Sequence, residues 1–421
     1  MTPRKLSRGV AVVGAGMSGF GAFPGLSTRD LFVDAFLDMR RSIDQGLDPA
    51  TIEALYLGNF SSSAFEGQGF IAPLTADAVG LLPKPSTRVE NACASGGTAV
   101  REAMIAVASG LYDVVLAGGI EKQTDLPIAR VTDVLATASD TQYEGPAGFT
   151  FPGLFGALAT AYMDRYGATP EAFMRVAIKN HDNGAVNPRA QFGKRIDDIM
   201  AAKRAAAERK GRTIPDWADE LEFLADDRAN PVIAWPMRLF DCSPVSDGAA
   251  CVLVVAAELA AQFTDSPLHI VGYGQASAGA AHDRADLTSL SATRDAASQA
   301  YAVSGLGPAD IDLAEVHDCF TIAEIMATED LGFFDAGRGW AAATDGATGR
   351  DGAIPINTSG GLKSKGHPVG ATGVAQVVEV WKQLRGEAGD RQVPGNPSLG
   401  LTHNLGGSGQ ACVVHIFQRR S

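Results

Sequence analysis

Residues 89–99 read VENACASGGTA, and residues 366–373 read GHPVGATG. Each stretch places one reactive side chain, Cys93 or His367, just before small residues, and each leads into an apolar run that predicts a helix. When Cys93 is aligned with His367, two further pairs match, Gly96 with Gly370 and Thr98 with Thr372. The two stretches therefore look like equivalent positions of an internal repeat.

The repeat extends beyond these two stretches. Residues 10–16 (VAVVGAG) resemble residues 269–274 (HIVGYG), and residues 46–53 (GLDPATIE) resemble residues 305–312 (GLGPADID). Residues 113–119 correspond loosely to residues 401–407, and amphipathic segments such as 30–45 and 294–303 alternate with strand-like runs. The pattern predicts an α/β fold of two duplicated halves, with mixed sheets and with helices packed between and outside them.

A stretch of different composition separates the two halves. It is rich in aromatic and charged residues and contains a highly charged, helix-like segment near residues 201–210. A strand-like run at residues 247–255 then resembles a return strand of the first half, after a turn that Pro244 and Gly248 favour. We therefore predict a first half (residues 1–122 and 242–262), an inserted loop domain (residues 123–241) and a second half (residues 263–421).

The composition is typical of a large enzyme. The 421 residues are 46% hydrophobic, which is enough for more than one core, and the formal net charge of −13 argues against nucleic acid as a partner. No apolar run reaches the ~18 residues that a membrane span needs, and the N-terminal residues do not resemble a signal peptide. Five cysteines without CxxC spacing fit a reducing compartment, so we expect a cytoplasmic protein.

One glycine motif suggests a function that its context excludes. Residues 14–19 (GAGMSG) follow a predicted strand and satisfy the dinucleotide-binding pattern. However, Pro24 and Gly25 lie where the phosphate-binding helix should run, and Ser27 with Asp30 looks like the capping pair of a helix that begins later. We therefore expect no nicotinamide or flavin cofactor at this motif.

Cys93 is the candidate nucleophile. At the start of a helix, unpaired backbone N–H groups and a partial positive charge favour a thiolate over a thiol and can bind an oxyanion. The alternative is a buried structural cysteine, which is the common fate of a cysteine between alanines. His367, at the equivalent position of the second half, would be the base that such a nucleophile needs, and it favours the first interpretation.

Five motifs together resemble one known family. They are the cysteine stretch, DGAA at residues 247–250, HDCF at residues 317–320, GHP at residues 366–368 and HNLGGSG at residues 403–409. Over nearly the whole chain they resemble the thiolase superfamily. The commonest thiolases have Asn-Glu-Ala-Phe and Cys-x-Gly at the positions where this chain has His317 and His403. The chain is more similar to the archaeal acetoacetyl-CoA thiolases and to the sterol-carrier-protein type.

The resemblance implies a fold and an activity. The thiolase fold stacks two duplicated α/β halves as αβαβα layers, adds a loop domain, and forms a homodimer or homotetramer. The implied activity is that of an acetyl-CoA C-acyltransferase, which makes or cleaves acetoacetyl-CoA or another 3-oxoacyl-CoA by ping-pong chemistry through an acyl-Cys93 intermediate. Coenzyme A thioesters are the substrates, and no cofactor is expected.

The resemblance also assigns roles to four side chains. His367 accepts the proton of the Cys93 thiol. Cys319, from the HDCF motif, is the second acid/base and exchanges a proton with the α-carbon of the substrate, a task for which a neighbouring histidine can lower the pKa of a thiol. His317 polarises the enolate oxygen.

Further residues are expected to form the walls of the pocket. Backbone N–H groups at Cys93 and near Leu405 and Gly406 would hold the oxyanion. His403 stands where many thiolases have their second cysteine, and three roles stay open: it lines the pocket, orients a catalytic group, or packs against the glycine-rich turn. The candidate substrate-binding residues are Ser246, Ser359 and Gly360.

The remaining cysteines and histidines carry no predicted role. Cys242, Cys251 and Cys412 lie in apolar or turn contexts and are expected to be inert, and His181, His269, His282 and His415 have no reactive neighbours in the sequence. A zinc site built from His317, Cys319, His367 and His403 is conceivable by residue type. Ligands so far apart in the sequence give no spacing signal, so no metal is expected.

A second class of function stays open. Archaeal thiolases work beside a hydroxymethylglutaryl-CoA synthase and a small zinc-ribbon OB-fold protein, and other relatives of the superfamily are acyltransferases or retro-aldolases. The chain could be a subunit of such a complex. The aldolases often lack the nucleophilic cysteine, so Cys93 and Cys319 favour acyl-enzyme chemistry. The charged segment 201–230 looks longer than in the archaeal enzymes, and we expect it to affect CoA entry or assembly.

Overall fold

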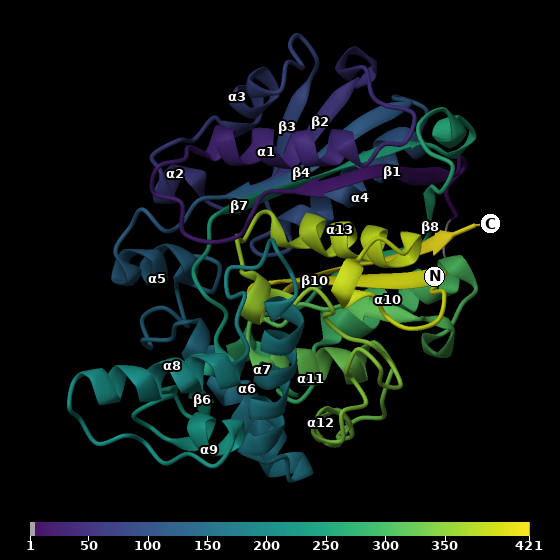
Figure 1. Cartoon of the computed structure of the whole chain (residues 1–421). Coiled ribbons are helices and arrows are strands. Elements are labelled where there is room, and N and C mark those ends of the chain that lie inside the picture. Colours follow the sequence, from purple (N-terminus) through teal and green to yellow (C-terminus); the bar gives the residue numbers. More distant parts are fainter. Residues whose placement is uncertain (1–4, 421) are drawn as a thin grey trace.

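The computed structural model describes residues 5–420 and contains a mixed sheet of nine strands (Figure 1). The order across the sheet is β3-β2-β4-β7-β1-β8-β11-β10-β9. The first half of the chain supplies β1 (Val10–Met17), β2 (Ala54–Gly58), β3 (Ser86–Val89), β4 (Val114–Glu121) and β7 (Gly248–Ala256). The second half supplies β8 (Leu268–Ser277), β9 (Leu313–Glu315), β10 (Leu399–Gly406) and β11 (Ala411–Arg419). The predicted return strand is β7, which lies between β4 and β1.

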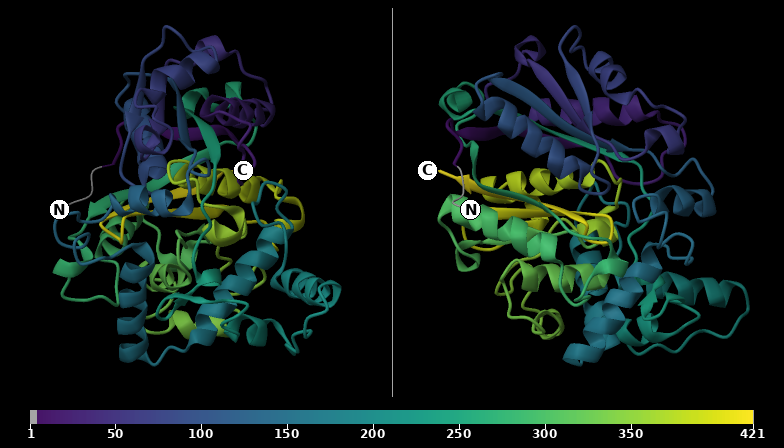
Figure 2. Two further views of the ribbon diagram at one scale, coloured as in Figure 1. Left: turned by 90° about the vertical axis from the view of Figure 1, so that its left-hand side faces the viewer. Right: turned by 180° about the vertical axis from the view of Figure 1, so that it is seen from behind.

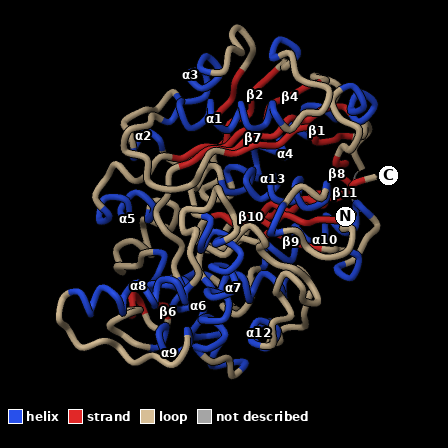
Figure 3. Tube along the Cα trace, viewed as in Figure 1, coloured by secondary structure: helices blue, strands red, loops and turns tan. Residues whose placement is uncertain are grey.

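The two halves of the sheet meet at one short contact. β1 pairs with β8 through Ala11 with His269 and Val12 with Leu268. These two strands are the corresponding first strands of the predicted repeat. The two sheets that the sequence predicts are therefore joined edge to edge, and Figure 3 shows the strands of both halves as neighbouring groups.

Helices and the two parts of the sheet alternate in layers (Figures 1 and 2). Helix α1 (Thr28–Arg41) covers the outer face of β1 and β7, and α10 (Ser291–Ser304) covers the outer face of β8 and β11. Helices α4 (Ser95–Ala108) and α13 (Thr372–Arg385) lie between the two parts and contact each other. From Thr372 to Leu384 every residue of α13 except Lys382 is buried, as expected for a helix surrounded by protein. This is the predicted αβαβα arrangement.

The glycines of residues 14–19 serve packing. A Cβ atom on Gly16 would lie 2.0 Å from the backbone nitrogen of Met39, so this glycine lets α1 lie directly against β1. Helix α1 begins only at Thr28, and Ser27 and Asp30 form its capping box as predicted. The motif therefore lacks the helix start that would hold a dinucleotide phosphate.

The inserted segment forms a helical region beside the second half, in teal at the lower end of both views of Figure 2. It consists of α6 (Phe151–Tyr166), α7 (Pro170–Ala185), α8 (Ile196–Arg209), α9 (Glu220–Ala225) and the two short strands β5 (Val232–Ala234) and β6 (Met237–Arg238). Helix α5 (Ile128–Ala136), also in the inserted segment, lies apart from this region and contacts α2 (Ser62–Phe65) of the first half (Figure 1). The charged segment predicted near residues 201–210 is α8. Across the described part of the chain, no helix has both the length and the apolarity to cross a membrane.

Candidate active site

The facing ends of α4 and α13 bring the two halves of the repeat together. A Cβ atom on Gly96 would lie 2.7 Å from the carbonyl oxygen of Gly370, and one on Gly119 would lie 2.2 Å from the same oxygen. Side chains there would push the two helix starts apart, which explains the paired glycines of the two stretches. Cys93 and His367 precede these helix starts and therefore face each other.

Cys93 sits at a strained turn rather than inside the helix. Ala92 has a φ of 49°, in the left-handed region that non-glycine residues rarely adopt, and the helix cap is Ala94. Burial raises the pKa of the Cys93 thiol to about 12, against a hydrogen bond from the Gly407 N–H to its sulfur, which lowers it. The expectation of a resting thiolate is therefore wrong. The group is a neutral thiol at neutral pH and must lose its proton as it attacks.

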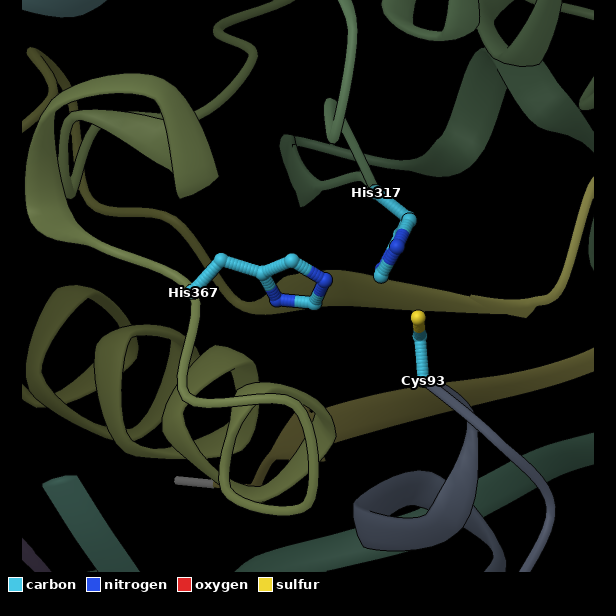
Figure 4. A group of neighbouring side chains, drawn as sticks. All are labelled: Cys93, His317 and His367. Carbon is cyan, nitrogen blue, oxygen red and sulfur yellow. The ribbon is translucent and has the colours of Figure 1, made fainter. Parts of the chain in front are cut away.

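His367 is held as a proton acceptor. Its Nδ1 lies 2.7 Å from Thr372 Oγ1, and that hydroxyl donates its own hydrogen to the carbonyl of Pro368 at 3.0 Å. The threonine oxygen must therefore accept from Nδ1–H, which leaves a lone pair on Nε2. Figure 4 shows Nε2 on the side of the ring that faces Cys93 and His317. Burial, with the charge of Lys365 added, lowers the pKa of His367 to about 3, so the ring is neutral.

His317 completes the group at the centre of the site. The potential ligand atoms of Cys93, His317 and His367 all lie within 4.8 Å of one another (Figure 4). The two imidazoles meet edge to face, with ring centroids 5.0 Å apart. Asn404 Nδ2 lies 3.2 Å from His317 Nδ1, whereas His317 Nε2 is buried and has no hydrogen-bond partner among the described residues.

A cavity of about 180 Å³ opens on Cys93, His367 and Cys319. Its walls also include side chains of the inserted segment, among them Phe151. Burial raises the pKa of the Cys319 thiol well above its ordinary value, and the nearby Cys93 adds to the effect. The second cysteine is therefore also a neutral thiol when no substrate is bound.

Cys242 also lies in the wall of this cavity, although no sequence motif places it there. It pairs with Phe320 in an isolated β-bridge, and the next residue, Ser243, donates its backbone N–H to the carbonyl oxygen of Cys319 at 2.9 Å. The expectation that Cys242 is inert stays a prediction, although the residue lines the cavity that Cys93 and Cys319 share. Cys251 and Cys412 are fully buried inside β7 and β11.

A second cavity of about 560 Å³ shares the Cys242 and Ser243 walls with the first. It is lined mostly by the inserted segment, including His181 and Phe192, and by the buried Lys363 of the second half. The reactive group thus has a larger, mainly apolar cavity beside its own, with Cys242 and Ser243 in the walls of both. A site of this shape suits a long substrate whose reacting end meets two thiols.

The comparisons with known proteins agree with this geometry. Residues 10–258 match the thiolase N-terminal domain, and residues 274–419 match the thiolase C-terminal domain-like family. The chain belongs to the thiolase family. It is 45% identical to the acetyl-CoA acetyltransferase of Methanothermobacter thermautotrophicus over 98% of this chain and 100% of the relative. It is 32% identical to sterol carrier protein 2 of Bos taurus over 97% of this chain and 72% of the relative.

A solved structure is similar over the whole length. The Ltp2-ChsH2(DUF35) aldolase aligns with a TM-score of 0.79 and 25% identity, covering 99% of each chain. The thiolase fold predicted from the sequence is therefore confirmed by both the family match and the structural neighbour. The similarity also shows that the thiolase fold is compatible with aldolase activity in another protein.

The glycine-rich strand approaches Cys93 one or two residues later than predicted. Gly407, rather than Leu405 or Gly406, lines the cavity and donates its N–H to the Cys93 sulfur. Leu405 is fully buried, and a Cβ atom on Gly406 would lie 2.6 Å from the carbonyl oxygen of Asn91. The correction follows from the turn after β10, which the sequence marks as glycine-rich without showing which N–H points inward.

His403 orients a neighbour and does not reach the cavity. Its Nδ1 accepts the backbone N–H of His317 at 3.2 Å, and its Nε2 lies 2.9 Å from Thr293 Oγ1. Burial lowers the pKa of His403 to about 3. Of the three roles left open by the sequence, the contacts support positioning of the segment that carries His317, and both ring nitrogens are too fully engaged to bind a metal ion.

The three predicted substrate-binding residues are placed elsewhere. Ser246 is buried and accepts the backbone N–H of His367 at 2.8 Å, so it positions the base. Ser359 Oγ is bonded to Glu315 and accepts from Lys365 at 2.8 Å. A Cβ atom on Gly360 would lie 2.7 Å from the Cα atom of Gly184 in α7. None of the three lines either cavity, because each is covered by a segment distant in the sequence.

Sequence reasoning did not single out two residues that support the reactive group, one by direct contact and one through neighbouring backbone. Asn404 touches both Cys93 and His317, and it stands beside His403 in the HNLGGSG motif. Glu121 accepts backbone N–H groups from Phe60 and Gly370, which ties a first-half loop to the turn after His367. Burial raises the pKa of Glu121 to about 7. The HNLGGSG motif could have pointed to Asn404. No sequence feature pointed to Glu121 except its place at the end of a predicted strand.

Proposed function

We propose that this thiolase is an acetyl-CoA C-acyltransferase that interconverts two molecules of acetyl-CoA with acetoacetyl-CoA and CoA. The observation that carries the proposal is the convergence of two thiols, Cys93 and Cys319, with His367 in one cavity. A thiolase needs one thiol to hold the acyl group and a second acid/base to move the α-proton. The name of the 45% identical relative supports acetyl-CoA as the substrate.

The cleavage direction starts from the protonation states found at the site. Cys93 attacks the 3-oxo carbon of acetoacetyl-CoA while its proton passes to the lone pair on His367 Nε2. The bond between C2 and C3 then breaks, leaving acetyl-Cys93 and the enolate of acetyl-CoA. The Cys319 thiol gives its proton to C2 of that enolate, which releases acetyl-CoA. A neutral Cys319 is the form that this step requires.

The second half-reaction restores the enzyme. Free CoA enters as a thiol and gives its proton to the Cys319 thiolate, and its sulfur then attacks the acetyl-Cys93 carbonyl. Cys93 leaves as a thiolate and recovers its proton from the imidazolium of His367. The second acetyl-CoA departs, and every proton is accounted for. Condensation is the same sequence in reverse, and none of its steps requires a cofactor or metal ion.

Intact-protein mass spectrometry after treatment with acetyl-CoA tests this proposal. We expect a single acetyl adduct on the native protein, located by peptide mapping at Cys93, and thiolysis of acetoacetyl-CoA when CoA is added. Cys93→Ser should remain folded, carry no thioester adduct and lose turnover. An adduct elsewhere, or turnover by a Cys93→Ala variant, would contradict the assignment.

A second candidate function rests on the aldolase similarity. A retro-aldolase cleaves a carbon–carbon bond without an acyl-enzyme, so it would need no thiol at position 93. The two reactions are distinguishable: an aldolase would keep activity in Cys93→Ala and release an aldehyde or ketone, whereas the proposed reaction releases more than one equivalent of acetyl-CoA per site only when CoA is present. The buried Cys93 and Cys319 favour the acyltransferase.

The assembly and location of the protein are part of the proposal. We infer a homodimer or homotetramer, because β3 ends the sheet with an unpaired edge that a second copy can extend. The name of the aldolase neighbour includes a DUF35 protein, which favours a small zinc-ribbon OB-fold partner, with a hydroxymethylglutaryl-CoA synthase as a further one. Five free cysteines favour the cytoplasm. Light scattering and co-purification from the native host would test the assembly.

A further inference from the structure

We propose that Asn404 is a positioning residue that fixes the tautomer of His317, so that a buried Nε2–H group without a protein partner is held beside Cys93 and His367. The inference deepens the proposed acyltransferase function, because that N–H is the donor that the enolate oxygen needs. It concerns a residue in β10 that makes no contact with the cavity itself.

The orientation of the Asn404 amide is fixed by two backbone groups. The N–H of Gly97 donates to Asn404 Oδ1 at 3.0 Å, and Asn404 Nδ2 donates to the carbonyl oxygen of Cys93 at 2.9 Å. A flipped amide would face an N–H with its own NH₂ and a carbonyl with its own oxygen. Glycines surround the amide closely, since a Cβ atom on Gly373 would lie 2.1 Å from Oδ1. The amide therefore has a single orientation.

That orientation determines where the His317 proton resides. The second hydrogen on Asn404 Nδ2 points to His317 Nδ1 at 3.2 Å, so Nδ1 must present its lone pair. Burial and the neighbouring His367 lower the pKa of His317 well below its ordinary value, so the ring carries one proton at neutral pH. The proton is then on Nε2. His317 Nε2 has no partner in the described part of the chain, which leaves the N–H free for a substrate oxygen.

The Asn404 amide therefore positions both the proposed nucleophile, Cys93, and the proposed hydrogen-bond donor, His317. It holds the carbonyl of Cys93 and the ring of His317 at once, while His403 holds the backbone N–H of His317. A substrate carbonyl attacked by Cys93 and an enolate oxygen bound to His317 are thus positioned by one side chain of one strand. Preorganised donors of this kind stabilise charge as it develops, without reorganisation during the reaction.

The hydrogen bond from Asn404 to His317 also explains why Cys93, His317 and His367 form a poor metal site despite their residue types. A metal ion would need the lone pair of His317 Nε2, which requires the proton to move to Nδ1. Histidines that bind metals usually donate their other N–H to a carboxylate or a carbonyl. Asn404 offers His317 Nδ1 an N–H instead, so it opposes the metal-binding tautomer. Replacing the amide with a carboxylate should reverse both properties.

Asn404→Asp is the direct test, because aspartate has nearly the shape of asparagine. One carboxylate oxygen accepts the Gly97 N–H as before, and the other accepts from His317 Nδ1–H, which removes the donor from Nε2. The hydrogen bond to the Cys93 carbonyl is lost as well. We expect acetylation of Cys93 to fall by no more than about tenfold. Exchange of the acetyl-CoA α-protons in deuterated water should fall by about 10²–10³, the usual effect of losing one such donor. Zn²⁺ should inhibit the variant, with reversal by EDTA, at concentrations that leave the native enzyme active.

The substrate-free native enzyme supplies a test that needs no variant. In protein labelled with ¹⁵N-histidine, the His317 signals should show a protonated Nε2 and an unprotonated Nδ1, and Asn404→Asp should exchange the two. Asn230→Asp makes the same change in a buried asparagine of the loop domain, which donates to Leu224, and should leave the ratio of exchange to acetylation unchanged.

The outcomes distinguish this inference from the proposed function. A native His317 with its proton on Nδ1 overturns the inference even if acetyl-Cys93 forms. Equal losses of acetylation and exchange in Asn404→Asp, with unchanged His317 signals, would also overturn it and leave Asn404 as a structural residue. If the native enzyme forms no acetyl adduct, the proposed function fails, while the tautomer assignment stands or falls on the spectrum alone.

Discussion

His317 and His367 meet with their ring planes at 82°, and their Nδ1 atoms are bonded in opposite senses. Thr372 accepts a hydrogen bond from His367, and Asn404 donates one to His317. One imidazole therefore offers a lone pair at Nε2 and its neighbour offers an N–H. Burial lowers the pKa of both rings, so neither changes charge near neutral pH, and the division between base and donor is set by these two partners.

Thr372→Val removes the acceptor for His367 Nδ1–H while keeping the shape of the side chain. The imidazole is then free to place its proton on either nitrogen, so we expect the rate of Cys93 acetylation to fall by about 10–100-fold. Single-turnover mass spectrometry with acetyl-CoA measures that rate. Thr75→Val is the matched control: Thr75 is buried in α3 (Ile71–Ala78) and donates to a carbonyl four residues earlier, as Thr372 does. An unchanged rate in Thr372→Val would mean that the tautomer of His367 is fixed by other contacts.

Cys319→Ala should separate the two half-reactions. Attack by Cys93 needs only His367, so acetyl-Cys93 should still form, whereas α-proton exchange and condensation should fall by about 10²–10⁴, as for the loss of an acid/base. His403→Ala should keep measurable exchange, because both nitrogens of His403 are bonded away from the cavity. Exchange that survives in Cys319→Ala and vanishes in His403→Ala would transfer the role to His403.

The sequence was sufficient for the elements that repeat. Equivalent residues in the two halves predicted the facing helix starts, and the paired glycines Gly96 and Gly370 make the contact that joins them. The HDCF motif predicted that Cys319 and His317 would join Cys93, and the structure brings all three together. Repeats and motifs can be recognised in the sequence without knowledge of the tertiary fold, so the predictions that rest on them hold in the structure.

The features that the sequence could not predict depend on which distant segments of the chain pack over a residue. The neutral thiol of Cys93 follows from its burial in the folded protein, which an argument from the local helix start does not include. Cys242 reaches the site through a bridge to Phe320, far away in the chain. Gly360 packs closely against Gly184 of α7, another distant segment, and therefore does not line the pocket. Each case needs the position of a second segment before the first can be interpreted.

The segment between residues 201 and 230 packs into a small apolar cluster that it shares with α7, which predicts the effect of Trp217→Ala. Trp217 is 8% exposed, meets Phe223 edge to face with ring centroids 5.0 Å apart, and donates Nε1–H to Asp226 at 2.9 Å. Its truncation should lower the free energy of unfolding of this region by about 3 kcal/mol and expose α8 to proteolysis. Limited trypsin digestion measures the effect, with Ile214→Ala, at a half-exposed side chain, as the control. Equal digestion of both variants would show that the Trp217 contacts do not hold the segment.

Deleting residues 201–230 should act on substrate binding or assembly without touching the thiols. The deletion removes Trp217 and Phe223 from a cluster that also contains Met174 and Ala177 of α7, and α7 contributes His181 to the larger cavity. We expect a changed Michaelis constant for CoA substrates or a changed oligomeric state, with Cys93 still alkylated by iodoacetamide. Steady-state kinetics and light scattering would detect either change. If both measurements match the native protein, the segment is a surface elaboration.

Buried neutral histidines should make the protein sensitive to acid. The pKa of His403 is lowered to about 3 in the folded protein, against an ordinary value of 6.5, so between these values the unfolded chain holds a proton that the folded chain does not. The stability from this group is therefore present above pH 6.5 and is lost as the pH falls towards 3, with a slope of about 1.4 kcal/mol per pH unit.

His403→Gln keeps an acceptor for the His317 N–H and a donor for Thr293 but cannot titrate. Urea unfolding of both proteins at several pH values between 4 and 8 should show a shallower slope for the variant below pH 6, while a constant offset at pH 7.5 measures any packing loss. Parallel curves over the whole range would show that His403 does not contribute to the acid sensitivity.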